Sequence, residues 1–513
     1  MKNLNVLLIT IDAWRFDALG AAPDHHWLRR YGLENLLSTP NLEQLANESL
    51  YFTQALSTAP HTTVSHASIM TGLFPPQHGV RSFFYESLPQ EITTLAEHFK
   101  KNGYKTIALR EAESLQEPGL LEKVNVLRGF DHVINNLDQL VTISKSDGDQ
   151  PIFAFLHFWD LHAPYLYSVW ASQNGALELL ENKTSSLAAE WGIPLQAGKQ
   201  VSERSAMEFQ KNLASKIRDT QLRIRTLFEW YLEGVNWFDN TRLPYLAERL
   251  KAAGLWEDTV HILFGDHGEG VHPDGVGFKA FEHSQSLLDD VLRVPLLIHG
   301  IPNQTPSRIN EQVSLVDIFP TALELAGIPV TRELFGEAEF HGNSLLGSAD
   351  TSLEKERYHI AELCIGDQES ETKQSAPQRI YQRCIRTSRN KLVAHQPPFI
   401  MKRYQLTEDR IQKVINKSNQ LMNRLALDGL KIEKPVNLFT GKERFYFTNL
   451  LEDPDELRPG FAGEQKSAEF SMLKQKLELA YRAQRWGSPI NSEDLDHSIL
   501  IERLADLGYV GRN

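Results

Sequence analysis

Short, unbroken runs of apolar residues recur along the first two thirds of the chain, separated by stretches with helical periodicity. The clearest runs are Val6 to Ile11, Pro151 to Trp159 and Thr259 to Phe264, and Tyr51 to Leu56 and Tyr104 to Leu109 are similar. Runs this short and this apolar are typical of strands that are buried on both faces of a parallel sheet. We therefore predict buried parallel strands in an α/β domain.

The stretches between these runs predict helices. Ile92 to Asn102 is amphipathic, and Thr39-Pro40 has the residues that commonly begin a helix. A long helix is predicted after residue 218, because apolar and aromatic side chains recur there at helical spacing. We expect these side chains in the core rather than in contact with a substrate: Leu227, Tyr231, Val235 and Phe238.

The pattern changes after about residue 350, where four short segments resemble antiparallel strands. They are Tyr358 to Cys364, Tyr381 to Thr387, Lys391 to His395 and Phe445 to Leu451. A chain of 513 residues also exceeds the size at which one core usually stops growing. We therefore predict two domains, residues 1–350 and 351–513, with helix-rich insertions at about 168–218 and 401–434.

Polar side chains follow three of the apolar runs, at the point where each run ends. Asp12 ends the first run, Asp160 and His162 follow the run that ends at Trp159, and Asp266-His267 follows Gly265. The carboxyl ends of parallel strands meet at the edge where α/β sheets bind ligands. An adjacent Asp and His on a tight turn offer one ion an oxygen and a nitrogen. Taken singly, Asp12 also fits a helix cap and His162 a core or surface histidine.

A second stretch, Ser57 to Gly79, supplies a candidate nucleophile. Pro60 favours an extended approach, and Ser65 or Thr63 is expected to cap a short helix that ends at Gly72. This places Thr62 at a loop-to-helix junction, where free backbone N–H groups and the helix dipole favour an anion. Its hydroxyl is a plausible nucleophile toward a phosphorus or sulfur ester if a divalent metal lowers its pKa. The alternative is an ordinary strand-turn-helix connection.

Composition limits the class of partner and the cellular compartment that we expect for this protein. A net charge of −13 argues against a general nucleic-acid binder. Two cysteines, Cys364 and Cys384, exclude a disulfide framework and are expected to be core thiols in a reducing compartment. No window approaches the length of a membrane span, and the N-terminus lacks the features of a signal peptide. We therefore expect a cytoplasmic protein.

The motifs as a set resemble the sulfatase branch of the alkaline phosphatase superfamily. In family order they are Asp12 with Arg15, Asp17 and Leu19-Gly20, then Thr39-Pro-Asn-Leu42, Ser65-His-Ala-Ser with Thr71-Gly72, Pro75 and His78-Gly79, Asp160-x-His162-x-Pro164, Asp266-His-Gly-Glu269, Leu292-Arg-Val-Pro295, Val316-Asp317 and Asn449 to Glu456. The resemblance implies a doubly wound α/β fold with a mostly parallel central sheet. It also implies a smaller C-terminal α+β domain with a four-stranded antiparallel sheet.

The resemblance also assigns roles to individual positions. Asp12, Asp266 and His267 match the metal ligands of the family, together with Thr62 in the place of the nucleophile. Three histidines take the places of other site residues: His66 that of an arginine beside the nucleophile, His162 that of an oxyanion contact, and His283 that of a lysine before the Arg-Val-Pro strand.

Departures from the family pattern change the expected chemistry. Sulfatases of this family use a formylglycine made from Cys or Ser, which Thr62 cannot form, whereas Thr nucleophiles occur in the family's phosphodiesterases and phosphotransferases. Ala13 stands where sulfatases often have another Asp ligand. With fewer oxygens than Ca²⁺ usually takes, one Mn²⁺ or Zn²⁺ is favoured, and Ca²⁺ or Mg²⁺ remains open. Leu109-Arg-Glu also replaces a segment that carries a pocket lysine in sulfatases.

The sequence thus predicts a metal-dependent hydrolase of phosphate esters that works through a phospho-threonine at Thr62. His66 and His162 are expected to donate to the phosphoryl oxygens, and His283 to protonate the leaving group or activate water. A phosphotransferase acting on an alcohol is the main alternative, ahead of a sulfatase or a metal-binding protein without turnover. A second ion held by Asp160, His162, His272 and His283 is also open. The expected partner is a small-molecule or lipid-headgroup ester, and a homo-oligomer is left open.

Overall fold

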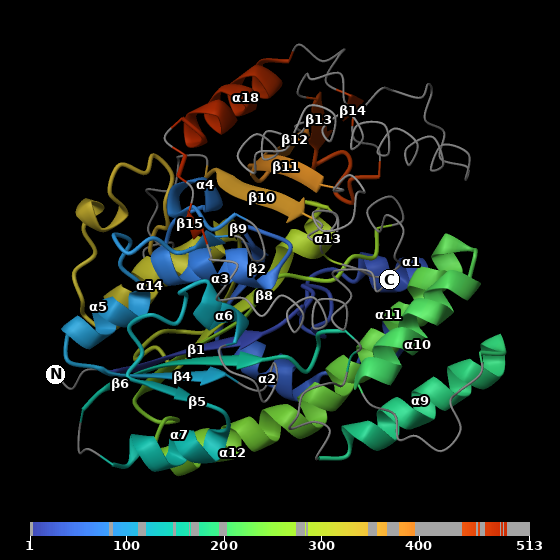
Figure 1. Ribbon diagram of the computed structural model, residues 1–513, viewed down its shortest axis with the longest axis horizontal. Helices are drawn as coiled ribbons and strands as arrows, with labels where there is room; N and C mark the ends of the chain where they lie inside the picture. Colours follow the sequence, from blue (N-terminus) through green and yellow to red (C-terminus); the bar gives the residue numbers. More distant parts are fainter. Residues whose placement is uncertain are drawn as a thin grey trace.

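The computed structural model describes residues 4–81, 86–110, 119–146, 150–163, 165, 174–193, 203–272, 283, 286–346, 357–366, 379–395, 444–457, 460–461, 467–482, 484–485 and 487–489. Its centre is an eight-stranded sheet in the order β5-β4-β6-β1-β7-β8-β2-β9 (Figure 1). The strands are β1 (Asn5–Ile11), β2 (Leu50–Leu56), β4 (Lys105–Arg110), β5 (His132–Ile134), β6 (Ile152–Phe158), β7 (Thr259–Gly265), β8 (Arg293–His299) and β9 (Ser307–Ser314). Strand β8 runs antiparallel to its neighbours β7 and β2, and the other pairs are parallel.

Strand β1 lies in the middle of the sheet because it has apolar side chains on both faces. Leu7, Ile9 and Ile11 belong to one hydrophobic cluster, and Val6 and Leu8 belong to the other. The register pairs Thr10 with His157 on β6 and with Phe264 on β7. The predicted buried parallel strands are confirmed.

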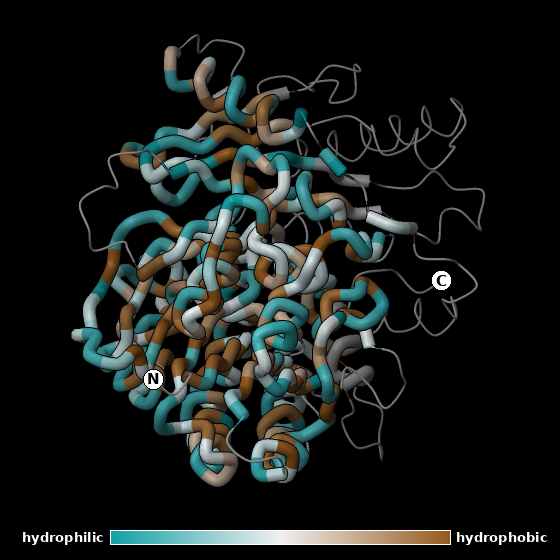
Figure 2. The backbone as a smooth tube through the Cα atoms, turned by 90° about the vertical axis from the view of Figure 1, so that its left-hand side faces the viewer, coloured by the Kyte–Doolittle hydropathy of each residue, from teal (hydrophilic) through white to brown (hydrophobic). Residues whose placement is uncertain are grey.

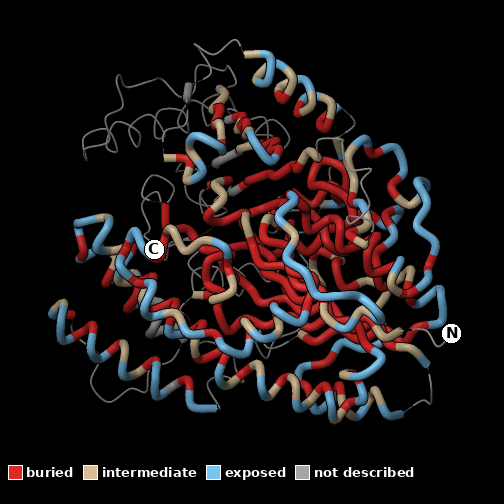
Figure 3. Tube along the Cα trace, turned by 180° about the vertical axis from the view of Figure 1, so that it is seen from behind, coloured by how far each residue is buried: buried red, intermediate tan, exposed pale blue. Residues whose placement is uncertain are grey.

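Helices cover both faces of the sheet, so the domain is doubly wound as predicted (Figure 1). One face is covered by α1 (His26–Tyr31), α2 (Pro40–Asn47), α7 (Leu137–Ser144), α9 (Ala176–Trp191), α10 (Glu203–Lys216), α11 (Thr220–Trp237) and α12 (Leu243–Ala253). The opposite face is covered by α3 (Thr62–Thr71), α5 (Leu95–Lys101), α6 (Leu120–Lys123) and α14 (Ile318–Leu325). Figures 2 and 3 show the same layering, with apolar and buried segments inside and polar, exposed helix faces outside.

The C-terminal part carries its own antiparallel sheet, as predicted. Its four main strands are β10 (His359–Gly366), β11 (Arg379–Arg386), β12 (Asn390–His395) and β13 (Arg444–Asn449), and the two-residue β14 (Gly460–Phe461) extends the edge. Helix α18 (Ala468–Ala480) packs on this sheet through Leu473 and Leu477. Cys364 and Cys384 are buried in β10 and β11, as expected for core thiols.

Some expectations fall outside the described residues. The insertion predicted at about 401–434 lies there, and so does the predicted domain boundary at residue 350. The other predicted insertion, about 168–218, contains α9 and α10. Within the described part of the chain, every helix is too short or too polar to serve as a membrane span.

Candidate active site

Three segments far apart in the sequence meet at the carboxyl edge of the parallel strands. Asp12 follows β1, Asp266 and His267 follow β7, and Thr62 is the first residue of α3. The Oγ1 atom of Thr62 lies 3.3 Å from Oδ2 of Asp12 and 3.5 Å from Nε2 of His267. That nitrogen lies 3.7 Å from Oδ1 of Asp12 and 3.6 Å from Oδ2 of Asp266. The structure therefore brings together the four residues that the sequence singled out.

Helix α3 begins at Thr62, earlier than predicted, because neither expected cap acts as one. Its N-cap is His61, in an extended conformation and without a side-chain cap hydrogen bond. The hydroxyl of Ser65 donates instead to the carbonyl oxygen of Asp266, 2.8 Å away, and so ties the helix to the turn after β7. The helix ends where expected, at Gly72 with a φ of 67°. The cap predicted at Ser65 or Thr63 is therefore wrong, whereas the junction at Thr62 is confirmed.

The residues present fit a divalent cation. Oδ1 of Asp266 accepts hydrogen bonds from the backbone N–H groups of Ala13 and His267, but no hydrogen bond from a described residue reaches its buried Oδ2. His267 donates Nδ1–H to the carbonyl of Gly268, which leaves the lone pair of Nε2 directed at the two carboxylates. Asp12, Asp266 and His267 form a group whose donor atoms lie within 4.8 Å of one another. Burial and the nearby Asp12 charge raise the pKa of Asp266, which a bound cation would reverse.

Two further histidines adjoin this group, and sequence reasoning missed one of them. His157 lies on β6, and its Nε2 is 3.0 Å from Oδ2 of Asp12. The signal was a histidine inside an otherwise apolar strand that precedes Asp160. His66, one turn after Thr62, has Nδ1 2.8 Å from the Thr62 carbonyl oxygen and 3.7 Å from Oδ2 of Asp266.

Both of these imidazoles are neutral. Burial, followed by the nearby His157, lowers the pKa of His66 to about 3, and burial lowers the pKa of His157 to about 4. A neutral His157 must therefore donate Nε2–H to Asp12, the kind of outer hydrogen bond that fixes a metal-binding carboxylate. His66, His157 and Asp266 also form a second group with donor atoms within 4.8 Å.

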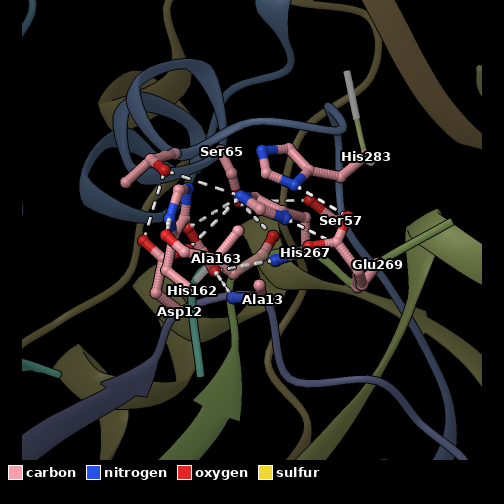
Figure 4. Close-up of polar contacts among 12 residues, drawn as sticks. Asp12, Ala13, Ser57, Ser65, His162, Ala163, His267, Glu269 and His283 are labelled. Atoms are coloured by element: carbon pink, nitrogen blue, oxygen red, sulfur yellow. Dashed lines mark hydrogen bonds and ion pairs between the residues drawn. The ribbon is translucent and has the colours of Figure 1, made fainter. Parts of the chain in front are cut away.

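His162 lies beside Asp12, whereas His283 and Glu269 lie on the other side of His267 (Figure 4). His162 has Nδ1 2.9 Å from the carbonyl oxygen of Ala163, and its ring centroid lies 5.3 Å from that of His283. His283 has Nδ1 3.0 Å from Oε1 of Glu269, and its ring centroid lies 4.4 Å from that of His267. Burial raises the pKa of Glu269 to about 7. Sequence reasoning gave Glu269 no role, although it belongs to the Asp-His-Gly-Glu motif.

The four residues considered for a second ion do not all meet. His162 and His283 are neighbours, but Asp160 pairs with the buried guanidinium of Arg242 at 3.4 Å. His272 contacts the carbonyl oxygen of Glu456 at 3.2 Å and packs edge-on against the Trp27 ring. His272, which the sequence left open as a ligand of a second ion, therefore lies against α1 and Glu456 and not with His162 and His283.

Arg15 and Tyr231 support the loops that carry the site. Arg15 makes a bidentate pair with Asp17, at 2.9 and 2.8 Å, and also donates to the carbonyl oxygens of Glu269 and Asp290. The hydroxyl of Tyr231 donates to the Ala13 carbonyl and accepts from the Arg15 N–H, both at 3.0 Å. Tyr231 is buried in the core as predicted. These contacts fix the backbone just after Asp12 and beyond His267.

A comparison with models of known protein families assigns the chain to one family. The family model described as "Sulfatase" matches residues 4–328, which contain all the site residues named above. The chain belongs to the sulfatase family. The enzymes of this family bind a divalent metal, which agrees with the donor set around Asp266.

Individual relatives of this sulfatase-family chain are distant. An ulvan-active sulfatase of Formosa agariphila is 27% identical over 349 residues, which are 65% of this chain and 63% of the relative. The multifunctional alkaline phosphatase superfamily protein PehA of Trinickia caryophylli is 22% identical, over 66% of this chain and 76% of its own length.

Among solved structures, the phosphonate monoester hydrolase of Agrobacterium radiobacter has the same fold. The two structures superpose with a TM-score of 0.58 at 17% identity, over 94% of this chain and 95% of the other. This agreement covers both the doubly wound domain and the C-terminal sheet.

Proposed function

We propose that this sulfatase-family protein hydrolyses phosphate esters, whether diesters, monoesters or phosphonate esters, with Thr62 as the nucleophile. The observation that carries the proposal is the Thr62 hydroxyl, which lies within 3.5 Å of both Asp12 and His267 in place of a formylglycine precursor. A divalent cation held by Asp12, Asp266 and His267 would lower the pKa of this hydroxyl and polarise a phosphoryl oxygen. The sulfate-ester reaction of the formylglycine enzymes needs an aldehyde that threonine cannot supply.

The position of Thr62 also favours an anionic substrate. As the first residue of the ten-residue helix α3, it lies where free backbone N–H groups and the positive end of the helix dipole meet. A phosphoryl group attacked by Thr62 Oγ1 would have its oxygens in this field. The extended His61 that precedes the helix keeps the hydroxyl on the side of Asp12 and His267.

The hydrogen bonds of His66 and His162 change the roles expected from the sequence. Each gives its Nδ1–H to a backbone carbonyl, of Thr62 and of Ala163 respectively. Burial lowers the pKa of both side chains, so each is neutral and presents a lone pair at Nε2. A neutral imidazole in this tautomer cannot donate to a phosphoryl oxygen. We therefore assign that role to the α3 N-terminus, and to His66 and His162 the binding of water or of a substrate hydroxyl.

Thr62→Ala tests the nucleophile. Turnover of p-nitrophenyl phosphate, bis(p-nitrophenyl) phosphate and a p-nitrophenyl phosphonate should fall by about three orders of magnitude or more. Thr63→Ala is the matched control, since it removes the same atoms from the next residue of the same helix and should leave turnover within a fewfold of wild type. Each substrate is assayed with Mn²⁺, Zn²⁺, Ca²⁺ and Mg²⁺ in turn. Equal rates for Thr62→Ala and wild type would rule out the assignment.

Three further measurements separate phosphate ester hydrolysis from the alternatives. A sulfate ester in the same panel should be turned over more slowly than the phosphate esters, and faster sulfate turnover would contradict the proposal. Peptide mass spectrometry after acid quench should find phosphate on Thr62. Added alcohols distinguish transfer from hydrolysis, because a phosphotransferase would yield the new ester as its main product.

A further inference from the structure

The edge strand β10 of the C-terminal sheet contacts the segment that leads to the nucleophile (Figure 1). This segment, residues 57–61, connects β2 with α3 and is called the nucleophile loop below. Nε2 of His359, the first residue of β10, lies 2.9 Å from the carbonyl oxygen of Ser57. The backbone N–H of Glu362 donates to the carbonyl oxygen of Thr58, also at 2.9 Å. The free edge of β10 is thus used to hold the nucleophile loop.

The imidazole of His359 is held by a hydrogen bond on each side. It is buried, and its Nδ1 lies 3.0 Å from the hydroxyl oxygen of Ser314 at the end of β9. Burial, followed by the nearby Arg386, lowers the pKa of His359 to about 3, so the ring is neutral. Because the Ser57 carbonyl can only accept, Nε2 carries the proton, and Nδ1 accepts from the Ser314 hydroxyl. His359 therefore forms a fixed bridge from β9 to the nucleophile loop.

The nucleophile loop is bonded on its other side to helix α3, which begins with Thr62. The hydroxyl of Ser57 lies 3.2 Å from Oγ of Ser65 (Figure 4). The hydroxyl of Ser65 in turn donates to the carbonyl oxygen of Asp266 at 2.8 Å. A continuous series of hydrogen bonds therefore leads from His359 in the C-terminal sheet to the turn that carries the cation ligands.

The position of the Thr62 hydroxyl depends on this loop, because Thr62 follows it directly. Reacting atoms must lie about 3–3.5 Å apart, and a misplacement of about 1 Å can cost about 100-fold in rate. All residues of the nucleophile loop are buried, so bulk water does not replace a hydrogen bond that the loop loses. A displaced loop would carry the hydroxyl away from Asp12 and His267, which it now approaches within 3.5 Å.

We propose that His359 is a positioning residue of the active site, which holds the nucleophile loop through the Ser57 carbonyl and so keeps the Thr62 hydroxyl beside the cation ligands. This inference rests on the proposed role of Thr62 as the nucleophile. It makes the C-terminal sheet necessary for fast turnover, although the cation ligands all lie in the N-terminal domain. Loss of the bond slows the attack by Thr62 and leaves substrate binding nearly unchanged.

The test is His359→Leu, with His359→Gln as the rescue. Leucine removes the donor and keeps a buried side chain of moderate size, whereas the amide N–H of glutamine can still donate to the Ser57 carbonyl. We expect His359→Leu to lower kcat by about 10- to 100-fold with KM within about threefold of wild type. His359→Gln should keep kcat within about threefold of wild type.

His261→Leu is the matched control. His261 is also a buried histidine of a strand, and its Nε2 contacts a backbone carbonyl oxygen, that of Leu255, at 2.9 Å. It lies near the start of β7, whereas the site lies beyond the end of this strand. His261→Leu should lower the unfolding temperature, as His359→Leu does, but should leave kcat within about twofold of wild type. This comparison separates positioning from a general loss of stability.

Hydrogen exchange measures the nucleophile loop without relying on turnover. Amide exchange in peptides that cover the loop should be at least about tenfold faster in His359→Leu than in wild type, and unchanged in His261→Leu. Peptides from β1, in the middle of the central sheet, report any change in global stability. The increase in the loop of His359→Leu should exceed the increase in β1.

Any of four results would overturn the inference: unchanged kcat in His359→Leu, a loss that appears in KM alone, equal losses of kcat in His359→Leu and His359→Gln, or unchanged exchange of the nucleophile loop in His359→Leu. The proposed function is tested separately by Thr62→Ala. If wild type turns over no phosphate ester, the proposed function fails, and the exchange measurement alone decides whether His359 holds the loop.

Discussion

At the scale of single residues, hydrogen bonds within the protein determine which donor atoms of the site remain available to a cation. Oδ1 of Asp266 accepts hydrogen bonds from two backbone N–H groups, whereas its Oδ2 faces Asp12 and His267. His157 donates to Asp12, and the Thr62 hydroxyl lies against the same carboxylate oxygen. Two buried carboxylates this close repel each other unless a proton or a cation lies between them.

The two neighbouring carboxylates predict that the stability of the metal-free protein depends on pH. Burial and the Asp12 charge raise the pKa of Asp266 to about 7, above its unfolded value of about 4. A raised carboxyl pKa stabilises the fold most at low pH, and this contribution is lost as the pH rises from about 4 through about 7. With metal chelated, Asp266→Asn should therefore unfold at a higher temperature than wild type at pH 8 and at a similar temperature at pH 5.

Saturating metal should reverse the order, because the cation stabilises the folded wild type and binds the variant poorly. The measurement is thermal unfolding of both proteins at pH 5 and pH 8, with chelator and with metal. A constant difference between the two proteins across pH would contradict the predicted cause.

At the scale of elements, the helices are held by side chains from distant parts of the chain. Helix α2 begins at the predicted Thr39-Pro40, yet the Thr39 hydroxyl accepts from Gly20 N–H and does not cap it. The cap comes from Asp239, whose carboxylate accepts from the N–H groups of Asn41 and Leu42 at 3.2 and 2.7 Å. Asp239 lies in a π-helical turn, Phe238–Arg242, that interrupts the junction of α11 and α12.

We predict that Asp239→Ala lowers the free energy of unfolding by about 1–3 kcal/mol, because it leaves two backbone N–H groups at the start of α2 without their acceptor. The neighbouring Asn240→Ala is the control. Asn240 is exposed and bonds the carbonyl of Asn236 one turn earlier, so its loss should change stability by no more than about 0.5 kcal/mol. Urea unfolding followed by circular dichroism measures both, and equal effects would contradict the capping role.

At the scale of the whole molecule, buried ion pairs join the two sheets. Asp289 of α13 (Asp289–Leu292) pairs with Arg386 of β11 at 2.7 Å and with Lys391 of β12 at 2.8 Å. Lys391 also lies 2.8 Å from Glu456. On the opposite side of β10, Arg81 makes a bidentate pair with Glu362, at 2.6 and 3.0 Å. The C-terminal sheet is thereby fixed to α13, just before the Arg-Val-Pro strand β8, and on its other face to Arg81.

Lys391→Met should lower the free energy of unfolding by about 3–5 kcal/mol, because it leaves Glu456 buried without its cation. Lys474→Met serves as the control, since Lys474 is exposed and its pair with Glu478 lies within one helix; its loss should cost less than about 1 kcal/mol. Chemical unfolding of the two variants measures both losses. Equal losses would show that the buried pair stabilises the protein no more than the exposed pair does.

The sequence by itself determined the strands, the family and the donors at the strand ends. A buried strand needs consecutive apolar residues, and the chain direction places the residue after each parallel strand at one edge of the sheet. Asp12, Thr62, Asp266 and His267 could therefore be selected from the order of residues alone. Their local motifs were sufficient because each lies directly after a strand or at the start of a helix.

The tertiary structure alone decided which partners each side chain meets. That His157 reaches Asp12 depends on the register of β6 against β1. The contact between Glu269 and His283 joins residues that lie 14 positions apart in the chain. His272, which the sequence left open as a ligand of a second ion, faces Glu456 instead. Sequence distance cannot give these contacts, because they are set by strand pairing and side-chain packing between residues far apart in the chain.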